Sequence, residues 1–273
     1  MPELPEVEVT RRSIAPELVG RRVSGGAVRA PKLRYPLCAD LSKNLKGKTL
    51  LEVGRRGKYL LLNFGRGALL IHLGMSGSLR LLPSETPPQK HDHVDLEFGD
   101  RLLRLRDPRR FGAVLWFAAQ ADLAKHPLLS ALGIEPLEAE FTPDWLFAAT
   151  RGRRTPIKQL LMDSHLVVGI GNIYAAESLY RAGIDPRTPA GRIGLKRFDR
   201  LVQAIRATLE EAIAAGGSSL RDFIHSDGSS GYFQQQYFVY GRAGEACRVC
   251  RKTIRSLRQG QRATFFCPHC QRA

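Results

Sequence analysis

The sequence predicts an α+β protein with a β-sandwich in its N-terminal part, a helical C-terminal part and a cysteine-rich end. Short β-rich segments divided by Gly, Pro and Asp turns fill residues 21–118, and helical periodicity dominates after about residue 130. Four of the five cysteines lie in the last 27 residues. Strands followed by helices in separate parts of a chain are typical of α+β proteins. The 273 residues favour two domains over one.

The chain is strongly basic. Lys and Arg number 42 against 26 acids, a formal net charge of +16. An excess of this size points to a polyanionic partner, and nucleic acid is favoured over a membrane surface because no long basic amphipathic helix dominates. No apolar run approaches the roughly 18 residues that a membrane span needs. The N-terminus also lacks a basic-then-apolar signal pattern, so we expect a cytosolic protein.

Residues 3–19 are expected to form an N-terminal helix. Pro5 suits the first helical turn and Gly20 suits the stop, while Pro16 would shorten or kink the helix. The apolar residues that share one face of this helix are Val7, Ile14 and Leu18.

The β-rich region contains several short expected strands, whose lengths and turn-forming boundaries favour a sandwich. Residues 83–90 are expected to form an exposed loop. Lys58 lies at the entrance to an expected strand at residues 59–64 and alternates with apolar neighbours. This pattern places its side chain in a cleft or, as for most lysines, in solvent. Examples of the strands are residues 59–64, 68–72, 94–98 and 113–117.

Three helices are expected in the C-terminal part. Residues 195–213 form a strong amphipathic pattern that ends at Gly216-Gly217, and a shorter helix includes Ile157, Leu160 and Leu161. The third is marked by Ile173, Ala176, Tyr180 and Ile184.

A glycine-bearing turn, Gly169-x-Gly171, joins the second and third of these helices. Backbone N–H groups at the start of a helix suit an anion, and Asn172 is a candidate cap or phosphate ligand there. A plain helical hairpin is the alternative. The turn lacks the third glycine and the preceding strand of a dinucleotide site, which excludes NAD binding by this segment.

The cysteine spacing is the strongest local signal. Cys247-x2-Cys250 is followed after sixteen residues by Cys267-x2-Cys270. Four thiolates at this spacing close a tetrahedral zinc site between two knuckles, so the expected zinc is structural. The intervening segment is long enough for a β-hairpin.

The surroundings of this finger are basic. Residues 242–273 hold eight Lys or Arg and one acid, which suits a phosphate backbone. Cys38 stands alone, and we expect an ordinary buried or half-buried thiol.

The first residues carry a possible nucleophile. Removal of Met1 would leave Pro2 with a free secondary amine, and an α-amino group titrates roughly near pH 7.7–8.0. Such an amine can attack a sugar or carbonyl carbon and form an iminium. Glu3 and Glu6 follow at once and could move protons. The alternative is an ordinary helix start with a proline in its first turn.

Two loops contain residues suited to a nucleic-acid groove. In residues 107–112, Arg109 and Phe111 could reach into a groove with the ring wedged between bases, or could belong to a generic β-turn. Met75 lies in the glycine-flexed segment 72–77, where an apolar residue is usually part of the core.

Histidines flank an acid in His91-Asp92-His93. The run could suggest a metal site, but no other ligand cluster supports one. A histidine that hydrogen-bonds or contacts phosphate is the favoured interpretation.

Together these segments resemble the bacterial formamidopyrimidine-DNA glycosylases over essentially the whole chain. The matching segments are residues 1–7, 57–60, 72–77, 90–95, 107–112, 169–174, 226–228 and 261–267. The resemblance implies a base-excision repair enzyme that removes 8-oxoguanine and formamidopyrimidines from duplex DNA, a glycosidic hydrolase that is also a lyase cutting at the abasic site. It also implies an N-terminal β-sandwich domain at 1–132, a helical domain with a helix–two-turn–helix motif at 133–236 and the zinc finger at 237–273.

The resemblance assigns catalytic roles residue by residue. Pro2 would attack C1′ of the damaged nucleotide, and Glu3 would act as general acid–base in opening the sugar. Lys58 would assist at the lesion and in β-elimination, and Arg262 would contact phosphate and assist δ-elimination. Glu6 would hold the terminus in place.

Contacts to DNA follow from the same resemblance. Arg109 would face the orphaned cytosine and Phe111 would wedge beside it, with Met75 also filling the space of the extruded base. The residues implied to contact the DNA backbone are His91, Arg109, Arg153, Lys158 and Asn172.

Two further segments are compared with the family: one resembles a mobile loop of the family, and one departs from the family's pattern. Residues 218–237 resemble the family's lesion-capping loop. Arg151-Gly152-Arg153-Arg154 stands where many relatives have lysines, which keeps the charge and puts in doubt only the geometry of one phosphate contact.

Two alternatives remain at this point. An endonuclease VIII-like enzyme would prefer oxidised pyrimidines, but Leu4 in place of the usual glycine and the Arg109-Arg110-Phe111 turn argue against it. A non-catalytic zinc-finger DNA-binding protein would need neither the Met-Pro terminus nor Lys58. The family suggests a monomer.

Overall fold

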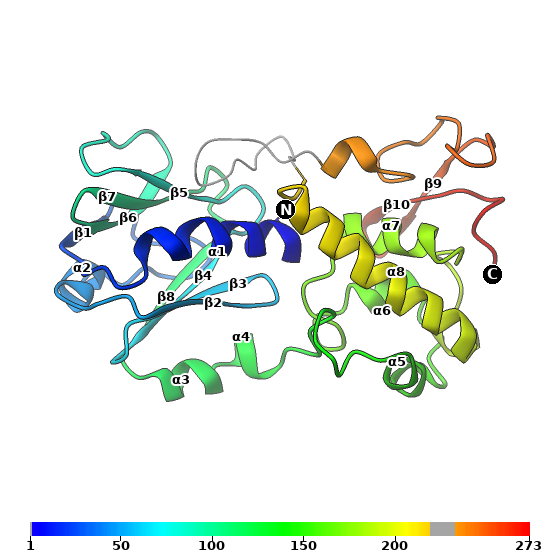
Figure 1. The fold of residues 1–273 in the computed structure, drawn as a ribbon, viewed down its shortest axis with the longest axis horizontal. Helices are drawn as coiled ribbons and strands as arrows, with labels where there is room; N and C mark the ends of the chain where they lie inside the picture. Colours follow the sequence, from blue (N-terminus) through cyan, green and yellow to red (C-terminus); the bar gives the residue numbers. More distant parts are fainter. Residues whose placement is uncertain (1, 219–232) are drawn as a thin grey trace. The chain divides into compact units, whose positions relative to one another are not determined.

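The computed structural model describes residues 2–218 and 233–273, which divide into two compact units. The first unit contains residues up to 130 together with a segment that begins at Ile213 and ends at Gln234, and the second contains the remainder (Figure 1).

Two four-stranded antiparallel sheets form the first unit. The order in one sheet is β1-β6-β7-β5 and in the other β2-β3-β4-β8. The first sheet contains β1 (Gly25–Val28), β5 (Ser78–Pro83), β6 (Asp92–Phe98) and β7 (Arg101–Arg106). The second contains β2 (Glu52–Arg56), β3 (Tyr59–Asn63), β4 (Ala68–His72) and β8 (Ala113–Phe117).

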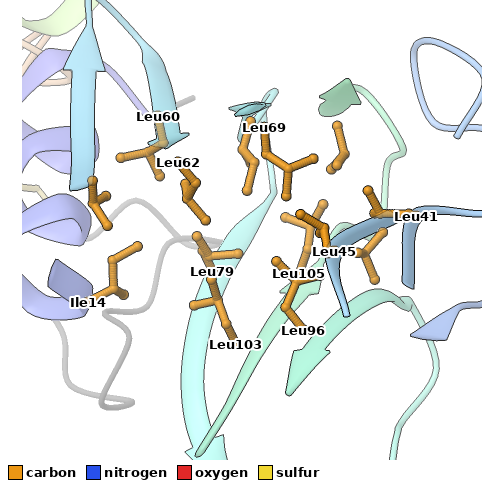
Figure 2. Close-up of a cluster of buried hydrophobic side chains, with 14 of the residues drawn as sticks. Ile14, Leu41, Leu45, Leu60, Leu62, Leu69, Leu79, Leu96, Leu103 and Leu105 are labelled. Carbon is orange, nitrogen blue, oxygen red and sulfur yellow. The ribbon is translucent and has the colours of Figure 1, made fainter. Parts of the chain in front are cut away.

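A single apolar core lies between the two sheets. Leu60, Leu62 and Leu69 of one sheet belong to the same buried cluster as Leu79 and Leu105 of the other. Figure 2 shows these side chains facing one another between the strands. Alternate residues of strands β3 to β8 enter this core, as expected for two packed sheets. The predicted sandwich is therefore confirmed.

Helix α1 (Leu4–Leu18) packs against β2 and β3 and closes one side of the core. Its predicted apolar face is buried, and Ile14 reaches the sandwich cluster (Figure 2). Pro16 lies in the last turn, where the helix continues for two more residues, and Gly20 follows at φ +83°. That positive φ suits glycine and ends the helix near the predicted residue.

Short helices complete this unit. Helix α2 (Leu41–Leu45) packs on β1. Helices α3 (Gln120–Lys125) and α4 (Pro127–Ser130) follow β8, and Leu123 packs with Ala68 on the outer face of the second sheet. The predicted loop after β5 is present and is largely exposed.

The second unit is mainly helical. Helices α6 and α7 are joined by the turns of residues 162–171, a helix–two-turn–helix arrangement, and the long amphipathic helix α8 is confirmed. Ile184 was expected in the third helix but lies beyond it, because Gly183 at φ +68° ends the helical path and Ile184 pairs with Arg272. The helices are α5 (Pro143–Thr150), α6 (Ile157–Leu161), α7 (Asn172–Arg181), η1 (Ala190–Arg192), α8 (Leu195–Ala214) and η2 (Phe233–Gln236).

The expected hairpin lies between the two cysteine pairs. Strands β9 (Arg255–Gln259) and β10 (Arg262–Phe266) pair antiparallel. Gly260 and Gln261 between them have φ +48° and +64°. Positive φ at both central residues is the signature of a type I′ turn, which matches the twist of the flanking strands.

Among the helices that the structure describes, none has both the length and the apolar character needed to cross a membrane.

A buried acid ties α1 to the β2–β3 hairpin. Glu8 accepts hydrogen bonds from Arg11 (2.8 Å), Arg12 (2.8 Å) and Arg55 (3.1 Å). Arg55 also donates to the carbonyl of Gly57 at the hairpin turn. Burial alone would raise the pKa of Glu8, but these hydrogen bonds and the charge of Arg11 lower it from 4.5 to about 2.

We therefore expect Glu8 to stabilise the protein in a pH-dependent way. Because the folded pKa is lower than the unfolded one, the stabilisation is complete above pH 4.5 and is lost as the pH falls toward 2. At pH 7, Glu8→Gln should lower the free energy of unfolding by about 1–2 kcal/mol, less than the full shift because the group is partly solvated. Urea unfolding between pH 7 and 3 measures this.

Glu17→Gln is the matched control on the same helix. Glu17 pairs with Arg101 at 3.4 Å with both side chains solvent-exposed, so its loss should change stability little. A stability difference for Glu8→Gln that stays constant with pH would contradict the assigned role.

Candidate functional site

The start of α1 is fixed by a reciprocal pair of glutamates. Glu3 is the residue before the helix and is buried, and its carboxylate accepts a hydrogen bond from the backbone N–H of Glu6. The Glu6 carboxylate in turn accepts from the Glu3 N–H at 2.8 Å. This capping box satisfies two backbone donors at the helix start and holds both acids next to Pro2, which is itself buried.

Glu6 has a second partner far along the chain. Its other carboxylate oxygen accepts from the backbone N–H of Ser218 at 2.9 Å. Gly217 precedes at φ +77°, and a Cβ there would lie 3.3 Å from the Glu6 side chain. A glycine therefore suits this close approach. The expected lesion-capping loop at 218–237, with its segment 226–228, lies largely outside the described residues.

Lys58 is located in a turn rather than in a strand. It follows Gly57 in the two-residue connection between β2 and β3, and Gly57 has φ +56°. Glycine with positive φ at the first position is typical of a type II′ turn. Lys58 therefore lies immediately before β3, in agreement with its expected place at the entrance to a strand, and is half-buried.

A neutral histidine lies near Lys58. Burial, the charge of Lys58 and the charge of Arg34 lower the pKa of His72 to about 4. The backbone N–H of Gly74 donates to His72 Nδ1 at 3.0 Å, which matches an unprotonated nitrogen. Sequence reasoning included His72 in a matching segment but gave it no role, since only the fold brings it beside Lys58.

The two loops that carry the expected void-filling residues lie against each other. A Cβ at Gly74 would lie 2.5 Å from backbone atoms of Phe111 and Gly112. Phe111 is 47% exposed, and the guanidinium carbon of Arg109 lies 5.0 Å from its ring centroid. Met75 is half-buried. The structure thus places these three residues on neighbouring loops.

His91 lies beside a β-bulge. It has φ +76°, and the register of β6 against β7 shifts between Asp92 and Val94. Bulges re-aim side chains next to functional sites. His93 is buried and its Nε2 lies 3.0 Å from the carbonyl oxygen of Asp107. This internal bond agrees with the hydrogen-bonding interpretation of the His91-Asp92-His93 run.

Lys158 and Asn172 are brought together in the second unit. Lys158 is 1% exposed, and its Nζ donates to Asn172 Oδ1 (2.6 Å), the carbonyl of Ala263 (3.0 Å) and Thr264 Oγ1 (2.7 Å). The ammonium therefore links α6 and α7 to β10, the strand that begins at Arg262. Asn172 is not the helix cap, because Gly171 occupies that position.

Exposed arginines surround a shallow pocket near the end of α5. Arg153 lines it together with Arg154 and Arg192. Gly191 allows the close approach of its two chain segments, since a Cβ there would lie 2.9 Å from the carbonyl of Arg153. Arg154 and Arg192 are further cations beside the expected phosphate contact.

The four cysteines converge as their spacing predicts. The sulfurs of Cys247, Cys250, Cys267 and Cys270 all lie within 4.8 Å of one another, and they form the one potential metal-binding group of three or more side chains in the described residues. Two of the sulfur pairs are 3.4 and 3.9 Å apart. In a tetrahedral site with Zn–S bonds of about 2.3 Å, the sulfur atoms lie about 3.8 Å from one another, so the four residues fit one structural zinc.

Neighbouring groups shift the pKa values of these thiols in opposite directions. The hydroxyl of Tyr180 on α7 lies 3.2 Å from Cys247 Sγ. Burial alone would raise the pKa of Cys247, but this contact and two backbone N–H groups lower it to about 6. Burial and the adjacent thiols raise the pKa of Cys270 to about 12. A divalent cation relieves this crowding of negative charge. Cys38, in contrast, is a half-buried thiol, as expected.

A second buried carboxylate anchors the segment that leads into the finger. Glu177 on α7 is 1% exposed and accepts the backbone N–H groups of Phe238 (2.8 Å), Val239 (3.0 Å) and Tyr240 (2.8 Å). Three such bonds satisfy a carboxylate that burial would otherwise penalise. The sequence offered no signal for Glu177, because it lies on a helix with ordinary apolar spacing.

We expect Cys267→Ser to lose zinc and DNA affinity together, because three thiolates and a hydroxyl no longer complete the site. Cys38→Ser, outside the finger, should keep one zinc per chain. Metal analysis of the purified proteins and fluorescence anisotropy with duplex DNA measure the two effects. Full zinc occupancy in Cys267→Ser would contradict the four-cysteine site.

We expect Lys158→Met to destabilise the protein by about 2–4 kcal/mol, because three buried acceptors lose a charged donor. The salt dependence of DNA binding should stay near that of the wild type. Arg153→Met, at an exposed cation, should leave stability unchanged and reduce the slope of log K against log salt by about 0.9. If Lys158→Met instead left stability unchanged and reduced the salt dependence of DNA binding, Lys158 would itself be a phosphate contact.

Comparison with known proteins gives a consistent match. The family models of the formamidopyrimidine-DNA glycosylase N-terminal domain, its H2TH domain and the zinc finger found in FPG and IleRS match residues 1–114, 132–224 and 244–273. A formamidopyrimidine-DNA glycosylase of Janthinobacterium sp. (strain Marseille) is 59% identical over 273 residues, covering all of both chains.

Solved structures agree with this match. A Lactococcus lactis FPG mutant in complex with a Fapy-dG containing DNA has a TM-score of 0.92 at 34% identity, covering all of both chains. A MutM in complex with carbocyclic 8-oxo-G containing DNA has a TM-score of 0.90 at 34% identity over the same coverage. The chain belongs to the formamidopyrimidine-DNA glycosylase family.

Proposed function

We propose that this chain removes oxidised purines from duplex DNA and then cuts the strand at the resulting abasic site, as a bifunctional enzyme of base-excision repair. The observation that carries the proposal is the full-length match to DNA glycosylases, which includes two structures with Fapy-dG or 8-oxo-G DNA. Damaged double-stranded DNA is therefore its partner, and the net charge of +16 suits a phosphate backbone.

Pro2 is the nucleophile in this proposal. With Met1 removed, its secondary amine attacks C1′, and the base leaves with the electrons of the N-glycosidic bond and gains a proton. The amine loses its proton, the C1′–O4′ bond of the sugar then breaks as O4′ takes up a proton, and an iminium between Pro2 and C1′ results. A chain that keeps Met1 has this nitrogen in an amide and cannot react. The box of Glu3 and Glu6 supports the assignment because it fixes the start of α1.

Glu3 is the general acid–base that moves protons as the sugar opens. Lys58 assists at the lesion and in β-elimination, where a proton leaves C2′ and the 3′ phosphate departs. Arg262 binds the remaining phosphate and assists δ-elimination. Its exposed position at the start of β10, next to a tight turn, supports a contact with phosphate. The finger's zinc holds this hairpin and takes no part in the chemistry.

The base is extruded from the helix before it is cut. Extrusion costs a few kcal/mol of stacking and pairing. Met75, Arg109 and Phe111 fill the vacated space, and Arg109 faces the orphaned cytosine. The partial exposure of Phe111 under the Arg109 guanidinium supports this role.

His91, Arg109, Arg153 and Asn172 form the proposed contacts to the DNA backbone, and Lys158, which the resemblance also implies as a contact, supports them from inside the second unit. Arg153 is exposed, which suits a direct contact. Lys158 already donates to three internal acceptors, so its contribution is to hold Asn172 and the Arg262 hairpin in place. A direct contact between Lys158 and phosphate stays a prediction.

The division into domains at 1–132, 133–236 and 237–273 is part of the same proposal, as is a monomeric enzyme. We also place the protein in the cytoplasm with the nucleoid, because its substrate is there.

Borohydride reduction tests the mechanism. The trimmed, zinc-loaded wild type should be trapped covalently on 8-oxoguanine duplex, because hydride reduces the iminium to a stable amine. Pro2→Gly and Glu3→Gln should lose base removal while retaining DNA binding. The absence of any trapped wild-type species, or normal excision by Glu3→Gln, would contradict the roles given to these residues.

The same assay separates the alternatives. A non-catalytic DNA-binding protein gives no trapped product on any lesion. An enzyme of the endonuclease VIII type cuts thymine glycol faster than 8-oxoguanine, whereas we expect the reverse order.

A further inference from the structure

Asp107 joins the two loops that carry the proposed void-filling residues. It is 0% exposed at the end of β7. One carboxylate oxygen accepts the hydroxyl of Ser76 at 3.0 Å, and the other accepts the backbone N–H of Gly112 at 2.8 Å. Ser76 belongs to the loop of residues 73–77, and Gly112 ends the turn of residues 107–112.

Ser76 completes a relay back to the turn. It is 5% exposed, and its oxygen accepts the backbone N–H of Arg109 at 3.2 Å while its hydroxyl donates to Asp107. The Arg109 backbone, the Ser76 hydroxyl and the Asp107 carboxylate are thus connected in sequence. A buried carboxylate needs such donors, and hydrogen bonds to a charged group are stronger than neutral ones.

The backbones of the two loops are also in direct contact. A Cβ at Gly74 would lie 2.5 Å from Phe111 and Gly112 backbone atoms, and one at Gly112 would lie 2.8 Å from the carbonyl of His72. Gly74 has φ +66°, which favours glycine. Neither loop can therefore shift far without moving the other.

The backbone of Asp107 is also held by hydrogen bonds to a third segment. The backbone N–H of Asp107 donates to the carbonyl of His91 at 3.0 Å, and its own carbonyl oxygen lies 3.0 Å from His93 Nε2. The base of both loops is therefore buried and hydrogen-bonded, while Arg109 and Phe111 on the turn of residues 107–112 are exposed and Met75 on the other loop is half-buried.

We propose that Ser76 and Asp107 are positioning residues that lock the two loops into one unit, so that Met75, Arg109 and Phe111 enter the duplex together. The inference rests on the proposed function and names the residues that set its base-extrusion step. Rigid placement lowers the cost of ordering these side chains when the base leaves the stack.

Two substrates measure the effect. Ser76→Ala removes both bonds of the hydroxyl, and Asp107→Asn keeps the shape but replaces one acceptor by a donor. Single-turnover excision of 8-oxoguanine opposite cytosine should fall roughly tenfold or more in both variants. Strand cleavage at a preformed abasic site should change less than about threefold, because extrusion costs least where the base is already lost.

The ratio of the two rates is taken within each zinc-loaded preparation, so partly inactive protein does not affect it. Ser78→Ala is the matched control, since Ser78 is as buried as Ser76 and does not belong to the relay. It should leave the ratio unchanged. An equal loss on both substrates, an unchanged ratio in the Ser76 and Asp107 variants, or a shifted ratio in Ser78→Ala would overturn the proposal.

A double-mutant cycle tests whether the relay acts through the loop tips. In a variant that already carries Arg109→Ala and Phe111→Ala, the addition of Ser76→Ala should lower the rate of 8-oxoguanine excision by less than about twofold. Two of the side chains that Ser76 positions are already gone in that variant. A full tenfold loss there would overturn the proposal. A wild-type enzyme that leaves 8-oxoguanine intact would instead refute the proposed function, which keeps the two failures distinct.

Discussion

The buried carboxylate of Glu6 is the constraint on which the proposed chemistry depends. It is 0% exposed and accepts two backbone N–H groups, those of Glu3 and Ser218, which are more than 200 positions apart in the chain. Each of these donors satisfies part of a buried carboxylate that burial would otherwise penalise. The start of α1, and with it Pro2, is therefore held to Ser218.

Buried polar groups set the geometry of other proposed contacts in the same way. Lys158 uses its three donors inside the second unit and holds the hairpin that presents Arg262. Glu177 fixes the chain that enters the zinc finger through three consecutive backbone amides. Asp107 does so for the exposed turn. The contact residues are at turns and strand ends, and the satisfied groups behind them make those positions rigid.

Local patterns explain what could be predicted from the sequence. The α1 and α8 helices follow from apolar spacing and glycine stops, and the zinc site follows from cysteine spacing, because each depends on residues close in sequence. Other features depend on pairing in three dimensions. The register of β2 against β3 makes Lys58 a turn residue, and the cap position of Gly171 excludes Asn172 from that role. The distant partners, Ser218 of Glu6 and Ser76 of Asp107, lie 212 and 31 positions away, which no periodicity reveals.

Covalent trapping by a Glu6→Gln variant tests the central claim most directly. Glutamine has the same shape, but one of its acceptor oxygens becomes a donor that faces a backbone N–H. The account predicts that borohydride trapping on an abasic-site duplex slows by about tenfold or more, with zinc content and DNA affinity close to the wild type. Trapping at the wild-type rate by folded Glu6→Gln protein would contradict the claim that this carboxylate positions the nucleophile.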